Sequence, residues 1–219
     1  NDDLAIYDRI EVVRGATGLT TGAGTPSAAI NLVRKRPTAT PQASFSASVG
    51  SWSNYRLEAD AANALNAAKT LRGRIVVTVQ DKQDFVDVLH GRNHQLYGIV
   101  EADLRPDTTL SVGAHYRKTD NDGVTTGVVT AADGSFLNLP RSTYLGTDFD
   151  EWRQTDKTIF AELEHRFANG WKAKLSATRK TPEIDTTFSG INRRGDTLRF
   201  NSQSYRAELA NTSYDANAS

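Results

Sequence analysis

Apolar and polar residues alternate one by one along most of the chain from Ala43 onward, which is typical of β-strands with one apolar and one polar face. From residue 71 to 79, for example, Leu, Gly, Ile, Val and Val occupy the odd positions, and Arg, Arg, Thr and Gln stand at 72, 74, 78 and 80. The pattern recurs in the segments 43–49, 55–61, 71–80, 95–104, 110–117, 158–167, 171–178 and 205–209. It predicts about eight strands of roughly nine to twelve residues, the length of a tilted strand that crosses a membrane.

The connections between the predicted strands alternate in length in the second half of the chain. Residues 105–107 and 168–170 form short turns, whereas the connections 119–155 and 181–202 are long. Outer-membrane barrels have short turns at one rim and long loops at the other. A soluble β-sandwich would share the alternation within strands, but here the polar faces carry long charged side chains and the apolar faces are diluted by Ala and Gly. The pattern therefore favours a membrane barrel.

Composition excludes several classes of function. The 26 basic residues balance the 26 acidic ones, so no excess of positive charge indicates a nucleic-acid partner. The chain has no Cys, which excludes thiolate metal sites and cysteine nucleophiles. No apolar run approaches the roughly 18 to 20 residues of a membrane helix. Any contact with a membrane is therefore expected to be made by strands.

The stretch 14–37 contains four glycines, at positions 15, 18, 22 and 24, ahead of a short apolar run. A phosphate-binding loop needs glycines that open a helix, so that backbone N–H groups face the phosphates. Residues 29–34 are instead partly β-branched and are followed by Pro37, which predicts a strand. The glycines do not indicate a nucleotide site.

No other group of residues predicts catalysis or a resident metal. His90 and His94 lie in a predicted loop, so they do not share a helix face that could bind a metal. Residues 120–123 lack the third acidic ligand of a calcium loop. No Ser-His-Asp, paired-carboxylate or Cys-His arrangement stands out. We expect no catalytic residues and no cofactor.

Three stretches, LAIYDRIEVVRG at 4–15, GAGTPS at 22–27 and INLVRKRP at 30–37, closely resemble the end of the plug domain of TonB-dependent outer-membrane siderophore receptors. The rest resembles the first part of their barrel, including the hairpin SVGSWSNYR at 48–56. The resemblance implies an all-β chain in which residues 1–40 are the C-terminal part of a plug domain. Residues 41–219 would be about eight strands of a truncated, partial transmembrane antiparallel β-barrel of the 22-strand type.

The resemblance implies a receptor in the bacterial outer membrane that binds a ferric siderophore and passes it to the periplasm when TonB remodels the plug. The sequence Ala-Thr-Gly-Leu at 16–19 resembles the sequence found in the branch of the family that takes hydroxamate-type and pyoverdine-type siderophores. Iron would arrive as cargo inside the chelate. The implied partners are the ferric siderophore, outer-membrane lipid, and TonB, which would contact a segment missing from this chain.

Other functions remain open. A TonB-dependent receptor could carry a different cargo, such as cobalamin or an oligosaccharide. A structural outer-membrane barrel or adhesin is an alternative from another class, although the plug-like start argues against it. A soluble β-sandwich enzyme is a further alternative, and nothing catalytic in the sequence supports it.

The resemblance also implies two sets of site residues. The ligand would meet extracellular loops and a plug apex, since aromatic side chains offer a large chelate contact area at small entropic cost. These expected ligand-binding residues are Thr20, Thr21, Gly22, Thr125, Thr126, Tyr144 and Trp152. Arg14 and Arg36 are expected to lock the plug to barrel carboxylates that lie beyond Ser219. The competing interpretations are loop packing for the aromatic residues and a solvated basic run for residues 34–36.

The chain is expected to be a fragment, because it stops at Ser219 without the aromatic final residue of such barrels. An eight-strand arc would leave two unpaired edges and an unfilled lumen. We therefore expect that it does not fold alone.

Overall fold

The computed structural model describes residues 3–15, 28–124, 127, 130–131, 133–194 and 197–219, and every regular element in these ranges is a β-strand. Two short strands, β1 (Tyr7–Arg14) and β2 (Ala28–Arg34), pair with each other. One large sheet holds β3 (Gln42–Gly50), β4 (Asn54–Ala64), β5 (Leu71–Gln83), β6 (His90–Arg105), β7 (Thr108–Asp122), β8 (Glu151–Arg166), β9 (Lys172–Arg194), β10 (Thr197–Glu208) and β11 (Asn211–Ala218). Within these ranges, no helix is long and apolar enough to cross a membrane.

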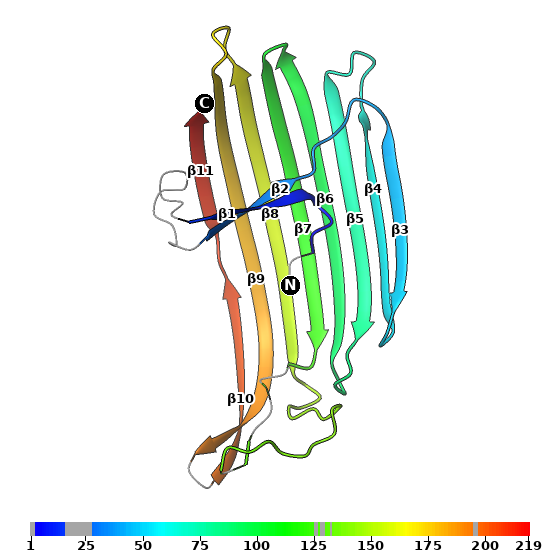
Figure 1. Cartoon of the computed structure of the whole chain (residues 1–219), viewed down its shortest axis with the longest axis vertical. Coiled ribbons are helices and arrows are strands. Elements are labelled where there is room, and N and C mark those ends of the chain that lie inside the picture. The colour runs from blue at the N-terminus through cyan, green and yellow to red at the C-terminus, as the bar shows by residue number, and fades with distance from the viewer. Residues whose placement is uncertain (1–2, 16–27, 125–126, 128–129, 132, 195–196) are drawn as a thin grey trace.

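From β3 to β10, each strand of the large sheet pairs antiparallel with the next strand along the chain. Figure 1 shows this sheet as a tall, curved layer, with β1 and β2 lying across one of its faces. We call the large sheet the wall, and the face toward β1 and β2 its inner face. The described residues 3–15 and 28–40, which include β1 and β2, are called the inner segment. The all-β antiparallel fold is as predicted.

The last position of the wall is shared by two strands, because β10 and β11 both pair with β9. β10 pairs with residues 183–194 of β9, and β11 pairs with residues 173–180. The break falls opposite Pro182, which has no N–H to donate and whose carbonyl accepts a hydrogen bond from Leu209 N at 3.0 Å. Counted by position, the wall therefore has the eight strands that the alternation predicted.

The prediction of a long loop over residues 181–202 is wrong. β9 continues to Arg194 and β10 begins at Thr197, so most of this stretch is paired strand. Polar side chains bond to one another across the pair, as Thr187 Oγ1 does to Ser204 Oγ at 3.0 Å. Because this extension has no apolar face to bury, it lacks the alternation that marks the other strands. The other long connection spans residues 123–150, since β7 and β8 reach further than predicted.

The two faces of the wall differ as the alternation predicted. Along β5, Ile75 and Val77 are 51% and 37% exposed on the outer face, whereas Val76 and Thr78 are 0% and 1% exposed on the inner face. The inner segment covers the inner face of β5 and β6, which accounts for this difference.

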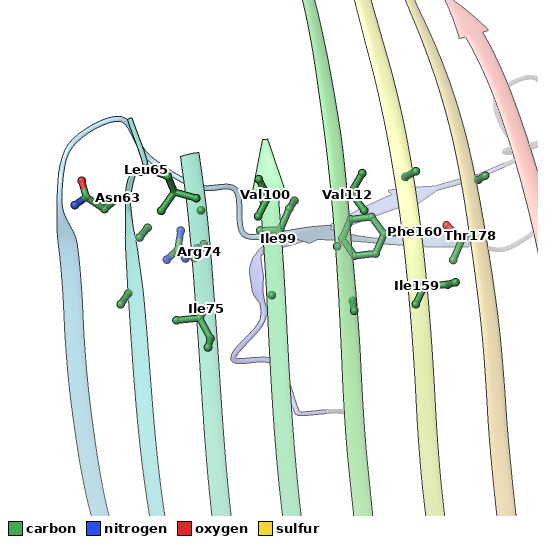
Figure 2. Close-up of a pocket in the computed structure, with 18 of the residues that line it drawn as sticks. Asn63, Leu65, Arg74, Ile75, Ile99, Val100, Val112, Ile159, Phe160 and Thr178 are labelled. Carbon is green, nitrogen blue, oxygen red and sulfur yellow. The ribbon is translucent and has the colours of Figure 1, made fainter. Parts of the chain in front are cut away.

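A broad apolar trough of about 1140 Å³ hollows the outer face. Figure 2 shows several of the side chains that line it, including Leu65, Ile75, Val100, Val112 and Ile159. Each of these five is more than two fifths exposed. A large apolar surface without polar cover is stable against hydrocarbon, so this face has the chemistry of the lipid-facing side of an outer-membrane barrel.

Candidate functional site

An apolar cluster joins the inner segment to the wall. Ile6, just before β1, is 1% exposed and packs with Val76, Tyr97, Ile99 and Phe160, all of them buried wall residues. Burial of one such aliphatic side chain contributes about 2 kcal/mol. The inner segment is therefore docked on the inner face rather than free in the lumen.

Arg36 lies at the exit of the inner segment and reaches three strands of the wall, β6, β7 and β8. Its Nη1 donates to Glu101 Oε1 at 3.0 Å and to Ser111 Oγ at 2.9 Å, and its Nη2 donates to Glu162. Burial lowers the pKa of Arg36, but the two carboxylates outweigh burial and raise it, so the guanidinium stays charged. The expectation that its partners lie beyond Ser219 is wrong, because both carboxylates belong to strands of this chain, β6 and β8.

Lys35 makes a second ionic contact next to the first. Its Nζ lies 2.8 Å from Asp60 Oδ2 of β4, and the Asp60 side chain is 6% exposed. Arg74 of β5 holds the same carboxylate through Nε at 2.8 Å and Nη2 at 2.7 Å. The backbone is fixed as well, since Tyr97 Oη donates to the Lys35 carbonyl at 2.9 Å and Arg74 Nη1 donates to the Arg36 carbonyl at 2.9 Å.

Asp3 makes a third ionic contact at the start of the inner segment. Arg56 of β4 donates to its two carboxylate oxygens at 2.5 and 3.0 Å, and Thr78 Oγ1 donates at 3.3 Å. Burial raises the pKa of Asp3, but its hydrogen bonds, the strongest of them from Arg56, lower the pKa by a larger amount. The net shift is downward, and the carboxylate stays charged. We call Asp3, Lys35 and Arg36, together with their wall partners Arg56, Asp60, Glu101 and Glu162, the ionic clasp.

A stack of planar groups supports the clasp. The Arg34 guanidinium carbon lies 4.2 Å from the centroid of the Phe160 ring, and Phe160 stacks on Tyr97 with centroids 6.3 Å apart and ring planes 12° apart. Gly113 of β7 makes room for the ring, because a Cβ there would lie 2.4 Å from Phe160 Cζ and 2.8 Å from the Gly98 carbonyl oxygen.

Arg14, the other predicted lock residue, lies at the end of β1 opposite Ala28. It is exposed, and no ion pair joins it to a carboxylate in the part of the chain that the structure describes. Its role stays a prediction.

Tyr144 lies in the connection 123–150, where its hydroxyl is used within the loop. It donates to Asp150 Oδ2 at 2.7 Å and accepts from Val124 N at 2.9 Å. Asp150 is 1% exposed and also accepts from Thr147 Oγ1 at 2.8 Å, and that hydroxyl lies 3.2 Å from Ser189 Oγ of β9. The loop is thereby tied to the extension of the wall, and only the ring of Tyr144 is left for contact with a ligand.

Trp152, near the start of β8, lines a cavity of about 440 Å³. Lys82, Arg117 and Gln154 line the same cavity, and the indole Nε1 donates to Gln154 Oε1 at 3.3 Å. The cavity offers a ligand the Trp152 ring together with a mixed polar lining, in which the cations Lys82 and Arg117 stand with the carboxylates Asp84 and Asp122 and with several side-chain amides. The predicted residues Thr20, Thr21, Gly22, Thr125 and Thr126 lie outside the described residues.

The carboxylates of the clasp were missed at the sequence level. Asp60, Glu101 and Glu162 each stand on the polar face of a predicted strand, well inside it. An acidic residue in the middle of the polar face of a predicted strand was therefore the sequence feature that could have identified these partners. No group of three or more His, Cys, Asp or Glu in the described ranges could hold a metal ion.

Known proteins of similar sequence are receptors. A ferripyoverdine receptor of Pseudomonas aeruginosa is 44% identical over 183 residues, which are 81% of this chain and 22% of that receptor. A ferric-pyoverdine receptor of another Pseudomonas strain is 42% identical over 190 residues, 86% of this chain and 23% of that receptor. The chain thus spans less than a quarter of the length of these curated relatives. No family model matches the sequence.

The fold is shared with a solved structure of the same kind. The crystal structure of the ferripyoverdine receptor of the Pseudomonas aeruginosa outer membrane, bound to ferripyoverdine, superposes with a TM-score of 0.91 at 39% identity. The match covers 99% of this chain, inner segment and wall together, and 30% of that chain. By sequence and by fold, this chain belongs to the family of TonB-dependent outer-membrane siderophore receptors.

Proposed function

We propose that the protein takes up a ferric siderophore through the outer membrane, powered by TonB and without catalysis. Residues 1–40 would be the C-terminal part of the plug and residues 41–219 the first part of the barrel. The observation that carries this proposal is the docking of the inner segment. A segment held by the ionic clasp on the polar face of a sheet, whose other face is apolar, suits a removable stopper in a membrane channel.

The cargo we propose is a ferric chelate of the pyoverdine class. The support is the identity of 44% with a ferripyoverdine receptor, together with the cavity beside Trp152. Gly123 and Val124, at the start of the connection 123–150, line this cavity. The adjoining ends of β7 and β8 lie at the lower end of the wall in Figure 1. The chelate would contact Trp152 and the ring of Tyr144, with the plug apex at Thr20, Thr21 and Gly22 and the loop hydroxyls of Thr125 and Thr126 completing the site.

Transport would require the clasp to open. TonB would pull on the plug, and the contacts of Arg36 with Glu101 and Glu162 would break before the inner segment moves. Arg14 would add a further contact of this kind in the complete barrel. The iron stays inside its chelate as cargo throughout.

The test is a fluorescence titration of the purified complete receptor with ferric pyoverdine, two ferric hydroxamates, cobalamin and an oligosaccharide. We expect saturable quenching by a ferric siderophore, with affinity reduced by about tenfold in Trp152→Ala, because loss of stacking on an aromatic ring costs about 1–3 kcal/mol. Trp171→Ala is the matched control, since Trp171 lies at a short turn and is 57% exposed. Quenching by cobalamin or the oligosaccharide, with none by any ferric siderophore, would contradict the proposed cargo.

A further inference from the structure

We propose that four residues of the wall, Glu58, Arg72, Arg74 and Lys174, are replacement partners that take over the charges of the ionic clasp when the inner segment leaves. This inference rests on the proposed function insofar as the inner segment is a plug that must move. Each wall residue of the clasp has one of the four beside it, with the opposite charge.

The two carboxylates that bind Arg36 each have a further cation on the wall within reach, and Glu162 also lies 3.9 Å from Arg34 of the inner segment. Arg72 Nη2 of β5 lies 3.7 Å from Glu101 Oε2, and Lys174 Nζ of β9 lies 3.1 Å from Glu162 Oε2. The Glu101 and Glu162 side chains are only 12% and 13% exposed. If Arg36 departs, both carboxylates therefore keep a cation that belongs to the wall.

The other two contacts follow the same arrangement. Asp60, which binds Lys35, is also held by both ends of the Arg74 guanidinium, at 2.8 and 2.7 Å. Arg56, which binds Asp3, also donates to Glu58 Oε2 at 3.1 Å. All four wall residues of the clasp therefore have a partner that stays in place when the inner segment moves.

The physical consequence concerns the cost of opening. Removing one partner of an ion pair leaves the other charge without its compensation, and the water that enters as the segment leaves offsets only part of this loss. A replacement partner removes most of that cost from the open state. In the closed state the replacement partner contributes less to stability, because the carboxylate is then also paired with Arg36 or Lys35. The replacement partners thus favour opening, although they take part in the same network that holds the segment closed.

This gives opposite signs for two kinds of substitution. Arg36→Met removes a contact of the closed state and is expected to make opening easier. Lys174→Met and Arg72→Met leave Glu162 or Glu101 without a cation only in the open state, and are expected to make opening harder. If Lys174 and Arg72 were merely supports of the closed structure, their loss would make opening easier, as the loss of Arg36 does.

The experiment measures opening directly, without siderophore or TonB. A cysteine is introduced at Ala5, which packs against the buried cluster, and maleimide labelling of the purified complete receptor in detergent is followed in moderate urea. When closure is fast, the labelling rate reports the population of the open state. We expect labelling to be about fivefold slower in Lys174→Met and in Arg72→Met, and about fivefold faster in Arg36→Met, as for an ion pair worth about 1 kcal/mol.

Two controls keep the outcome interpretable. Arg36, Arg72 and Lys174 line a cavity of about 290 Å³, and Arg166 lines it as well. Arg166→Met removes a cation from this cavity, but Arg166 pairs with Glu164 at 3.6 Å and is 67% exposed, so labelling should not change. Lys174→Arg keeps the charge and should restore the original rate. Labelling of Lys174→Met and Arg72→Met at the unchanged or a faster rate would overturn the proposal. Because no cargo is present, that result would leave siderophore binding untouched, and a failed binding titration would not alter this assay.

Discussion

At the scale of single residues, the inner face of the wall depends on the absence of one side chain. Gly113 has ordinary strand backbone, so its value lies in space rather than in conformational freedom. The Phe160 ring occupies the place that a Cβ would take, and from there it contacts both Arg34 and Tyr97. A glycine in a strand interior is intrinsically unfavourable, and its presence here is explained by this close approach.

Gly113→Ala is expected to push Phe160 out of its stack and to lower the free energy of unfolding by about 1–3 kcal/mol, the usual cost of overpacking. Urea unfolding of the purified complete receptor in detergent measures this change. Gly98→Ala is the matched control, because a Cβ at Gly98 meets nothing within 4 Å. Equal stability of the two variants would show that Gly113 is not required for the packing of Phe160.

At the scale of elements, buried hydrogen bonds fix the conformation of the connection 123–150. Gly146 lies so close to Tyr144 and Asp150 that a Cβ there would be 2.4 Å from the tyrosine hydroxyl and 2.2 Å from the carboxylate. Burial, and then the hydrogen bond to Asp150, raise the pKa of Tyr144 to about 12. Burial raises the pKa of Asp150, but hydrogen bonds from Tyr144, Ser189 and Thr147 lower it by a larger amount. The net shift is downward from 3.8.

These pKa shifts set a pH range for the loop. The folded loop holds the Tyr144 proton more tightly than an unfolded chain does, so this stabilisation is complete below pH 10 and is lost as the pH rises from 10 toward 12. The contribution of Asp150 is present above pH 3.8 and is lost as the pH falls below it. The difference in tyrosinate absorbance between the protein and Tyr144→Phe should show one step near pH 12. A step near pH 10 would mean that the hydroxyl is free in water.

The strands themselves could be predicted from sequence wherever one face meets lipid and the other faces the lumen, as along β5. Prediction failed over residues 181–202, because β9 and β10 extend there into a region where neither face is uniformly apolar. Backbone pairing and side-chain contacts between the two strands, such as Thr187 with Ser204, maintain this part of the pair. The basic residue Arg36 could be singled out, but not its partners. Many carboxylates stand on inner faces, and only the path of the inner segment across the wall selects Glu101 and Glu162.

At the scale of the whole molecule, two interactions of different kinds hold the inner segment. The apolar cluster around Ile6 is favoured by water exclusion, and the ionic clasp fixes position through directed hydrogen bonds. The wall in turn presents an apolar outer face that needs a membrane. The central claim is that the inner segment is a stopper, which must separate from the wall for the cargo to pass.

The most direct test of this claim is to tether the stopper and follow transport. Cysteines replace Lys35 and Asp60, which contact each other across the interface, and a short thiol-reactive linker with a reducible bond joins them in cells. We predict that uptake of radioactive iron from the ferric siderophore stops, that siderophore binding is retained, and that reduction of the linker restores uptake. The single variant Lys35→Cys, treated with the same linker, controls for the chemistry. Full uptake with the linker in place would contradict the claim that this segment leaves the wall during transport.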